Sequence, residues 1–371
     1  MTGGSTVYVI ASLEVGGAQT GLLRLVDLGF VEPRTTHLVS FAAADKSIRE
    51  GIDLRGPWAG LTIVERGPAL VRWAIGATLL AQLLMSRRPD LVVLSLEPAN
   101  LVGRFLRFLS PQTRFCSFEH SSRYRRRLYR CLLPFLARSI DVVLYDSLAT
   151  RQGIAPYYRA ASARWIHAPL FVADPEKPRK ANWEIGGGLR ILSVGRLVPA
   201  KNHFLLVETV AELKRRGFDV NCEIVGEGPL RSAIEHRCAA LGLGSSVRLI
   251  GQDTAWQGRA PTFDVYVQTS EHEGACLTVL EAMQAGLPVV ATPAGEIPLH
   301  LADGAGIVVE PPTASGLADA IEGLARDPDR RAALGRTAST RVATLYDRQV
   351  LVRRLSTIRA SLGLSRFTLS G

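Results

Sequence analysis

The chain has 371 residues, of which 47% are apolar and 21% are charged, and its formal net charge is +10. This length fits two domains of typical size, and the composition excludes a long disordered or fibrous segment. The five cysteines are scattered and form no CxxC pair, which excludes a cysteine-rich zinc or disulfide framework and is typical of free thiols in a reducing compartment.

The N-terminal sequence predicts a cytoplasmic protein. MTGGSTVYVIAS enters a strand-like run directly, without the basic region and long apolar region of a signal peptide. The longest run that could be taken for a membrane span, AIGATLLAQLLM at 74–85, is followed by Arg87 and Arg88 and is shorter than the ~20 residues that a bilayer requires. We therefore expect residues 74–85 to form a buried helix.

In the first half of the chain, short β-branched runs alternate with helix-like segments that contain Leu, Ala and Arg. The runs are VYVIAS (7–12), DLVVLSL (90–96), TRFCSF (113–118) and DVVLY (141–145). This alternation predicts βαβ units around a parallel sheet.

The alternation stops at 173–188, where prolines, charges and three consecutive glycines occur without an apolar period, as expected of an interdomain linker. It then restarts with LRILSVG, VNCEIVG, VRLIG, FDVYVQTS, LPVVAT and GIVVE. We therefore predict an α/β protein with two Rossmann-like, doubly wound domains, residues 1–172 and 189–346. Its ligand is expected in a cleft at the carboxyl ends of the strands.

The segment SEHEGACLTVLEAMQAGLPVVAT at 270–292 predicts a phosphate site between two acids. Residues 274–278 should form the first turn of a helix that leaves a strand end, and the free N–H groups there favour phosphate. Glu281 lies one turn further along the same helix face, where its carboxylate can accept hydrogen bonds from ribose hydroxyls. Glu273 precedes the helix, where a sugar joined to the phosphates would lie. The two acids are thus expected to bracket a nucleotide sugar.

Two cations and a pair of glycines follow other strand ends. Arg196, next to Gly195, follows a strand, and Lys201 opens the next helix. Together these two cations can neutralise a diphosphate leaving group without a metal. Gly16 and Gly17 follow the first strand, where the lack of a Cβ lets the backbone approach a ligand.

The spacing of Glu273 and Glu281, followed by EAMQAGLPVVAT, resembles the retaining glycosyltransferase family 4 of the GT-B fold. Three further segments resemble that family in the same order along the chain, namely GGAQTGLLRL (16–25), ILSVGRLVPAKNHFLLVE (191–208) and CEIVGEGPLRSAIE (222–235). Together the four segments span most of the chain.

The sequence departs from the family pattern in a few places. Ala275 and Cys276 replace the usual Phe and Gly or Pro, Glu296 replaces a glycine, and HAPLFVAD (167–174) lacks the usual NGVD turn. These departures concern the identity of the sugar more than the reaction.

The resemblance implies transfer of a hexosyl group from a nucleoside diphosphate sugar to a saccharide or lipid-linked acceptor, with retention, in cell-surface polysaccharide or glycolipid synthesis. It implies that His120 faces the donor sugar and that the C-terminal helix, within 347–371, returns to the N-terminal domain. The catalytic residues are then His120, Arg196, Lys201 and Glu273. The donor-binding residues are Gly16, Gly17, Gly195, Arg196, Lys201, Glu273, Gly274, Cys276, Leu277, Thr278 and Glu281.

No cofactor other than the sugar nucleotide substrate is expected, and no metal. Asp327-Pro328-Asp329 spells DxD, the manganese motif of a different glycosyltransferase fold. It lies between two helical patterns, which favours a loop and a helix N-cap.

Two other functions remain open at this point. A nucleotide-sugar epimerase can have the same two-domain fold, although its additional acid and base residues are not evident. A catalytically silent sugar-nucleotide-binding protein is the other alternative, because of the departures at Ala275, Cys276 and Glu296. The sequence does not decide between uracil and guanine as the base of the donor.

Residues 101–138 carry an excess of positive charge, with nine arginines and a single acid, Glu119. A helical plot places Tyr124, Leu128, Cys131, Leu132 and Phe135 on one side and Arg123, Arg126, Arg127 and Arg130 on the other. Either the apolar side packs and the basic side is solvated, or the surface rests on the anionic inner face of the membrane. Nucleic acid is not expected, because no stacking platform or recognition motif accompanies the arginines.

Overall fold

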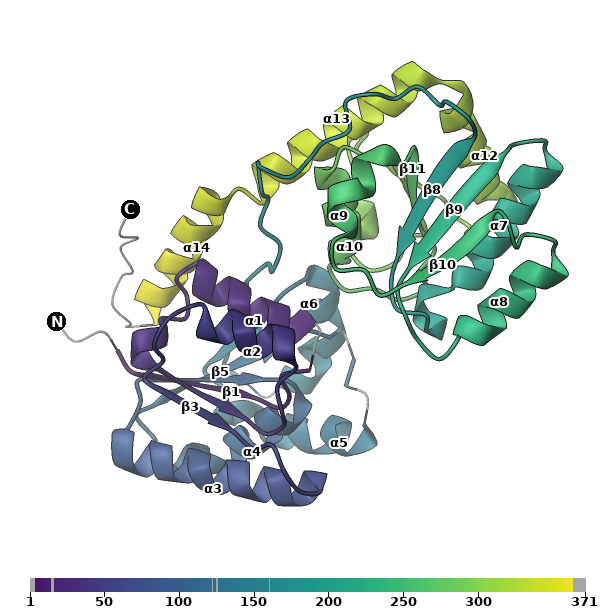
Figure 1. Cartoon of the computed structure of the whole chain (residues 1–371). Helices are drawn as coiled ribbons and strands as arrows, with labels where there is room; N and C mark the ends of the chain where they lie inside the picture. Colours follow the sequence, from purple (N-terminus) through teal and green to yellow (C-terminus); the bar gives the residue numbers. More distant parts are fainter. Residues whose placement is uncertain (1–3, 15–16, 122, 125, 160, 363–371) are drawn as a thin grey trace. The chain divides into compact units, whose positions relative to one another are not determined.

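The computed structural model describes residues 4–14, 17–121, 123–124, 126–159 and 161–362. The chain forms two compact units, residues 1–172 with 348–371 and residues 173–347 (Figure 1). The segment 173–188, which the sequence indicated as a linker, lies in the second unit. There the buried Lys180 donates a hydrogen bond from Nζ to the Phe263 carbonyl at 2.6 Å.

The first unit contains a parallel sheet with the strand order β3-β2-β1-β4-β5-β6-β7. Its strands are β1 (Thr6–Ile10), β2 (Thr36–Ser40), β3 (Gly60–Ile63), β4 (Leu91–Ser95), β5 (Arg114–Glu119), β6 (Val142–Tyr145) and β7 (Arg164–His167). Its α-helices are α1 (Gly17–Asp27), α2 (Lys46–Asp53), α3 (Ala69–Arg87), α4 (Glu97–Leu106), α5 (Arg127–Phe135), α6 (Leu148–Ile154) and α14 (Arg348–Ser361), and its 3-10 turns are η1 (Pro33–Thr35), η2 (Arg107–Leu109), η3 (Ala137–Ser139) and η4 (Ala155–Tyr158).

The second unit contains a parallel sheet with the order β10-β9-β8-β11-β12-β13. Its strands are β8 (Leu189–Val194), β9 (Val220–Val225), β10 (Val247–Gly251), β11 (Val265–Gln268), β12 (Val289–Ala291) and β13 (Ile307–Val308). Its helices are α7 (His203–Arg215), α8 (Arg231–Ala240), α9 (Trp256–Arg259), α10 (Leu277–Gln284), α11 (Ile297–His300), α12 (Ala314–Arg326) and α13 (Pro328–Leu345), with 3-10 turns η5 (Pro199–Lys201) and η6 (Ala260–Thr262).

The prediction of two doubly wound α/β units is confirmed, and all ten strands expected from the sequence are present. Three strands of the first sheet were not predicted: β2, β3 and β7. Their sequences, THLVS, GLTI and RWIH, are short and carry His, Gly or Arg, so the apolar signal that identifies a buried strand is weak.

Both faces of the first sheet are covered, because successive strand residues point to opposite faces. Tyr8 and Ile10 of β1 pack in a core with side chains from α1, α2 and α14, whereas Val7 and Val9 pack in a core with side chains from α3, α4, α5 and α6. Figure 1 shows α1 and α2 on one side of this sheet and α3 and α4 on the other. The helix that follows residue 347 therefore contributes to the core of the first unit.

Residues 74–85 lie in a helix, as predicted, but the prediction that this helix is buried is wrong. The helix α3 is 19 residues long, and only Gly76, Leu80 and Leu84 are buried in it. These residues recur every fourth position and so form one narrow stripe against the sheet. A Cβ on Gly76 would come within 2.3 Å of the Phe41 ring, so the helix lies close to the sheet along this stripe and its other sides face outward.

Of the two alternatives for residues 123–135, the one in which the apolar side of the helical plot packs against the protein is wrong. The helix α5 begins only at Arg127, and it buries Tyr129 and Leu133. Leu128 and Phe135, which were placed on the apolar packing side, are 53% and 85% exposed. Tyr124 is buried, but it precedes the helix and is fixed by its own hydrogen bond, so the plot assigned it to a face that it does not share.

Candidate functional site

In the second unit, two loops at the carboxyl ends of neighbouring strands bring Lys201 and Glu273 together. The strands β8 and β11 are hydrogen-bonded neighbours, and the loops that follow them are joined by a hydrogen bond from the Glu271 amide to the Ala200 carbonyl at 2.9 Å. Lys201 Nζ lies 2.5 Å from Glu273 Oε1. Two residues 72 positions apart in the sequence therefore form one ion pair at the end of the sheet.

The Glu273 carboxylate is held by further polar side chains. Its Oε1 accepts hydrogen bonds from Ser270 Oγ at 2.6 Å and from Gln268 Nε2 at 3.3 Å. The Glu273 side chain is 8% exposed and that of Lys201 is 18% exposed, so the pair is largely shielded but still reached by solvent. Gln268 and Ser270 were not predicted, although the polar residues at the end of an apolar strand and just after it are a recognisable signal.

Arg196 and Gly195 lie in the same loop as Lys201. The Arg196 side chain is exposed, and among the residues that the structure describes no carboxylate pairs with its guanidinium. The Arg196 carbonyl accepts a hydrogen bond from His203 Nε2 at 3.3 Å, and burial lowers the pKa of His203 to about 4. Because His203 is neutral at physiological pH, it holds the loop without adding charge, and the guanidinium remains available to an anion.

The glycines of the VGEGP segment allow a second loop to pack on this one. The Leu197 amide donates to the Glu227 carbonyl at 2.9 Å, and the Leu230 amide donates to the Leu197 carbonyl at 3.1 Å. A Cβ added to Gly228 would lie 2.4 Å from that Leu197 carbonyl oxygen. The close approach of the two backbones therefore requires glycine and fixes the loop that carries Arg196 and Lys201.

We predict that Gly228→Ala lowers the free energy of unfolding by about 1–3 kcal/mol, because the new methyl group overlaps a backbone carbonyl that cannot move without the Arg196 loop. The matched control is Gly244→Ala, where a Cβ meets no atom within 4 Å. Denaturant unfolding of both variants measures the difference. Equal stability of the two variants would show that the loop relaxes freely and is not fixed by this contact.

The helix after Glu273 begins later than predicted. The sequence placed its first turn at 274–278, but α10 begins at Leu277, and its N-cap Cys276 has a left-handed backbone with φ of 45°. The preceding loop is tied instead to the segment after β12: the Glu296 amide donates to the Gly274 carbonyl at 3.1 Å, and His300 Nε2 donates to the Ala275 carbonyl at 2.8 Å. The first helical turn therefore contains the predicted Leu277 and Thr278, but not Gly274.

Cys276 is unsuited to act as a nucleophile. Burial raises the pKa of its thiol to about 12, and the nearby Glu273 charge acts in the same direction. The thiol lies 3.8 Å from Thr278 Oγ1. Since the thiolate is the reactive form, a protonated, buried thiol at this N-cap serves packing.

Glu281 lies in α10, one turn after Leu277. Its Oε1 accepts a hydrogen bond at 3.2 Å from Gln257 Nε2 in α9. Glu281 is half-buried. Gln257 was not predicted, because no sequence motif contains it. Its hydrogen bond to Glu281 shows that α9 lies beside the predicted ribose site.

The DxD sequence is part of a helix start, as predicted. Asp327 is the N-cap of α13, and its side chain accepts a hydrogen bond from the Arg330 amide at 2.8 Å. Within the described residues, no three His, Cys, Asp or Glu side chains lie together as metal ligands would.

In the first unit, His120 follows β5 and is almost enclosed. Its side chain is 7% exposed, with Nε2 3.1 Å from Ser95 Oγ and Nδ1 3.6 Å from Asp146 Oδ2. Asp146 follows β6, the neighbouring strand, and was missed although an acid directly after VVLY is a recognisable signal. Gly17 is the first residue of α1, and Gly16 lies outside the described residues.

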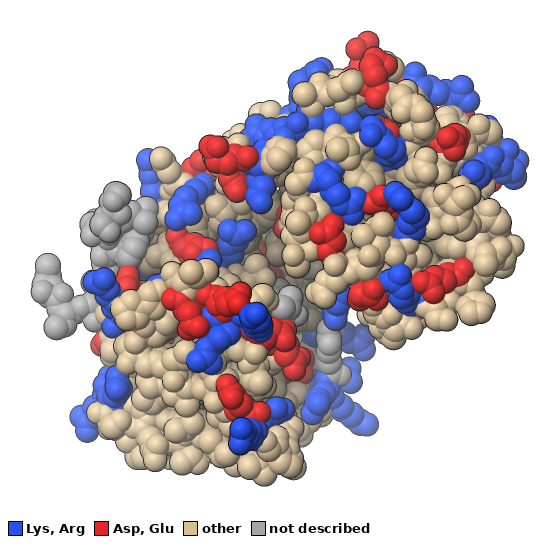
Figure 2. All heavy atoms as spheres, viewed as in Figure 1, with Lys and Arg blue, Asp and Glu red and all other residues tan. Residues whose placement is uncertain are grey.

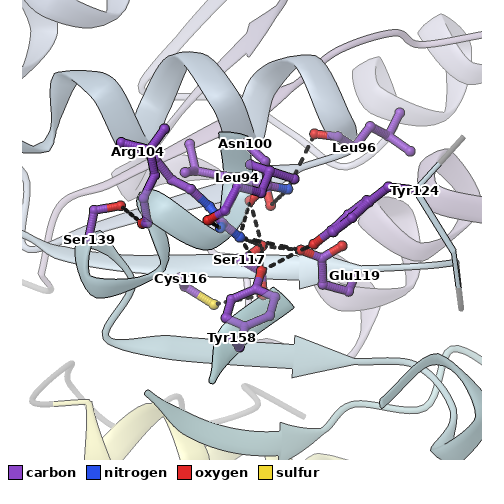
Figure 3. Close-up of polar contacts among 12 residues, drawn as sticks. Leu94, Leu96, Asn100, Arg104, Cys116, Ser117, Glu119, Tyr124, Ser139 and Tyr158 are labelled. Carbon is purple, nitrogen blue, oxygen red and sulfur yellow. Dashed lines mark hydrogen bonds and ion pairs between the residues drawn. The ribbon is translucent and has the colours of Figure 1, made fainter. Parts of the chain in front are cut away.

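A buried polar network lies directly before His120 (Figure 3). Glu119 Oε1 accepts hydrogen bonds from Tyr158 OH at 2.6 Å and from Tyr124 OH at 2.9 Å. Arg104, from α4, lies 3.7 Å from the same carboxylate oxygen and also donates to Tyr158 OH. Burial acts to lower the pKa of Arg104, but Tyr158, Tyr124 and Glu119 raise it above its usual value. Among the described residues Arg104 Nε has no hydrogen-bond partner, but the other contacts of this buried network fix the end of β5 that carries His120.

The comparisons with known proteins point to one family. The sequence profile described as glycosyl transferases group 1 matches residues 176–341, almost the whole second unit. The GDP-mannose-dependent alpha-(1-6)-phosphatidylinositol monomannoside mannosyltransferase of Mycolicibacterium smegmatis is 31% identical over 56% of this chain and 58% of that protein. The alpha-D-kanosaminyltransferase of Streptomyces kanamyceticus is 27% identical over 80% of this chain and 74% of that protein. The match thus spans little more than half of the mannosyltransferase.

Solved structures extend the likeness to both units. Anabaena HepE, in complex with UDP-glucose, matches with a TM-score of 0.78 and 17% identity over 96% of this chain and 100% of that chain. The lipopolysaccharide outer core galactosyltransferase WaaB matches with a TM-score of 0.71 and 17% identity over 96% and 99% of the two chains. These likenesses concern the fold, and they confirm the predicted GT-B class. Residues 176–341 of this chain are thus similar to the glycosyl transferases group 1 family.

Proposed function

We propose that this chain transfers a hexosyl group from a nucleoside diphosphate sugar to a saccharide or lipid-linked acceptor, with retained anomeric configuration and without a metal. The observation that carries the proposal is the Lys201–Glu273 pair beside the start of α10, within the segment that matches the group 1 family. An ammonium, a carboxylate and the backbone N–H groups of the first turn of α10 thus lie at one end of a sheet, which suits the phosphates and the sugar of such a donor.

In this proposal the protein acts by stabilising charge. As the bond between the anomeric carbon and the diphosphate breaks, the electron pair leaves with the phosphate oxygen. Lys201, Arg196 and the N–H groups of the first turn of α10 offset the negative charge that develops there. The acceptor hydroxyl forms the new bond to the anomeric carbon, and its proton passes to the departing phosphate. Glu273 orients the sugar and positions the Lys201 ammonium.

The roles of the remaining predicted residues follow from this arrangement. Glu281, beside Gln257, is the proposed acceptor of hydrogen bonds from the ribose hydroxyls. His120, aligned by Ser95 and Asp146, is proposed to contact the donor sugar, as the family resemblance implies. Gly17 is the first residue of α1. We propose that Gly16 and Gly17, which have no Cβ, allow the donor to approach the backbone closely.

The reaction is tested by incubating the protein with UDP-linked and GDP-linked sugars, with and without candidate acceptors. Both bases are needed, because one relative is named as GDP-mannose-dependent and one similar structure holds UDP-glucose. A transferase releases nucleoside diphosphate only when an acceptor is present. A new sugar nucleotide would indicate an epimerase, which none of the relatives named above is, and binding without turnover would indicate a silent binding protein.

We predict that treatment with EDTA leaves the rate of transfer unchanged. The positive charge that a divalent cation would supply to the departing diphosphate is supplied here by Lys201, Arg196 and the helix start. The measurement compares initial rates before and after removal of divalent ions by EDTA and desalting. A rate that falls and is restored by Mn²⁺ or Mg²⁺ would show that these cations are insufficient.

A further inference from the structure

The first unit gathers exposed apolar side chains on one layer of helices. The helix α4 contacts both α3 and α5, and the three cover the same face of the sheet. This layer and the adjacent η2 carry eight of the fourteen large apolar side chains that the described part of the chain exposes. We call these eight the outer apolar face: Leu70, Val71, Ile75, Met85, Phe105, Phe108, Leu128 and Phe135.

The outward side of α3 differs from that of an ordinary surface helix, which is polar or charged. Among its exposed residues Arg87 alone is charged, and the others are Ala69, Leu70, Val71, Ala74, Ile75, Thr78, Gln82, Met85 and Ser86. The helix is long and apolar enough to cross a membrane by length and composition, but only 17% of that apolar window is buried within the protein. In Figure 2 the lower surface of the first unit, where α3 runs, is mostly tan.

The same helix is part of the fold and cannot leave it. Gly76, Leu80 and Leu84 pack on the sheet, and the helix connects β3 to β4 within the unit. The helix axis therefore runs along the surface of the protein, and the apolar side of the helix is exposed. This is the geometry of a helix that lies in the plane of a membrane interface, with its apolar side toward the lipid.

Positive charge accompanies the apolar face at α5. Arg126 and Arg127 are exposed beside Leu128, which is 53% exposed, and Phe135 at the far end of the helix is 85% exposed. The sequence of α5 contains no acid, and neither does that of α3. Arginines beside outward apolar side chains complement a surface that has an apolar interior and anionic head groups.

We propose that the outer apolar face, with Arg126 and Arg127, docks the first unit on an anionic lipid bilayer as a peripheral membrane protein. The apolar side chains of α3 and α5 enter the boundary between head groups and acyl chains, and the guanidinium groups bind lipid phosphates. Exposed apolar side chains of a soluble domain are usually scattered singly, whereas eight of them lie on this one layer of helices. This inference does not rest on the proposed transfer reaction, although docking would bring the protein to a lipid-linked acceptor.

The test is sedimentation of the full-length protein with vesicles of phosphatidylcholine alone or with phosphatidylglycerol added. We expect binding that requires phosphatidylglycerol and weakens as salt screens the arginines. The double variant Arg126→Ser/Arg127→Ser should lower the apparent affinity about tenfold or more, since each basic side chain near an anionic surface contributes about 1 kcal/mol. Its charge-matched control is Lys177→Ser/Arg179→Ser, two exposed cations of the second unit, which should bind as the wild type does.

The apolar contribution is tested separately. Val71→Ser/Ile75→Ser and Leu128→Ser/Phe135→Ser should each lower vesicle binding about tenfold, because the apolar area they bury in the interface is lost. Ile250→Ser/Leu299→Ser, which removes two exposed apolar side chains of the second unit, is the control and should leave binding unchanged. Circular dichroism confirms that each variant is folded.

Three results would overturn the proposal. The first is equal binding to neutral and anionic vesicles, and the second is equal binding by the face variants and their controls. The third is a protein that ignores vesicles but forms dimers that Val71→Ser/Ile75→Ser dissociates in analytical ultracentrifugation, since the outer apolar face would then join two copies of the chain. Loss of vesicle binding with intact donor consumption would contradict docking alone and leave the proposed transfer standing.

Discussion

A Lys201→Ala variant should lose about 10²-fold or more in turnover, the size of effect that follows removal of one donor that stabilises a transition state. The Lys201 side chain, 2.5 Å from Glu273 and 18% exposed, is the ammonium that the account places at the departing diphosphate. The measurement is the steady-state kcat with saturating donor and acceptor.

The fold of Lys201→Ala should remain intact, because Ser270 and Gln268 still donate hydrogen bonds to the Glu273 carboxylate. The matched control is Lys177→Ala, which removes an exposed lysine of the second unit away from this pair and should turn over at the wild-type rate. Near wild-type turnover of folded Lys201→Ala would exclude this ammonium from the reaction.

The two acids should give opposite kinetic signatures. Glu281→Gln should weaken donor binding about tenfold with little change in kcat, because contacts to the ribose are the same in the ground state and the transition state. Glu273→Gln should lower kcat by about 10²-fold, because it removes both the group that orients the sugar and the partner that positions Lys201. Donor affinity from calorimetry and kcat from initial rates separate the two effects.

These two variants are each other's control, since each replaces one carboxylate by an isosteric amide in the same unit. The reversed result, with a kcat defect in Glu281→Gln and a binding defect in Glu273→Gln, would show that the nucleotide lies in the opposite direction along α10. Equal defects in both properties would show that neither acid has a distinct role.

All six strands of the second unit could be predicted from the sequence, because each is a short apolar run followed by a turn or a helical pattern. Lys201 and Glu273 were both predicted at the donor site because each follows a strand end, and the structure shows that they form an ion pair there. Parallel strands bring their carboxyl ends together, so residues far apart in sequence meet there without any further signal.

Other features depend on contacts that a one-dimensional pattern does not contain. The left-handed backbone of Cys276 delays the start of α10, since the loop before it bonds to Glu296 and His300 from a later segment. A helical plot assumes a continuous helix, and it failed where α5 begins only at Arg127. An apolar sequence does not show how many sides of the helix are packed against the protein. The helix α3 was therefore expected to be buried, although a single stripe of side chains packs it on the sheet.

The most direct test of the proposed reaction follows one mixture of protein, sugar nucleotide and acceptor by proton NMR over time. We expect the anomeric signal of the donor to fall as a new glycosidic signal of the same anomeric configuration rises, in step with free nucleoside diphosphate. A new glycosidic signal of inverted configuration would contradict retention. Donor that stays unchanged with every acceptor, although it binds to the protein, would contradict the transfer itself.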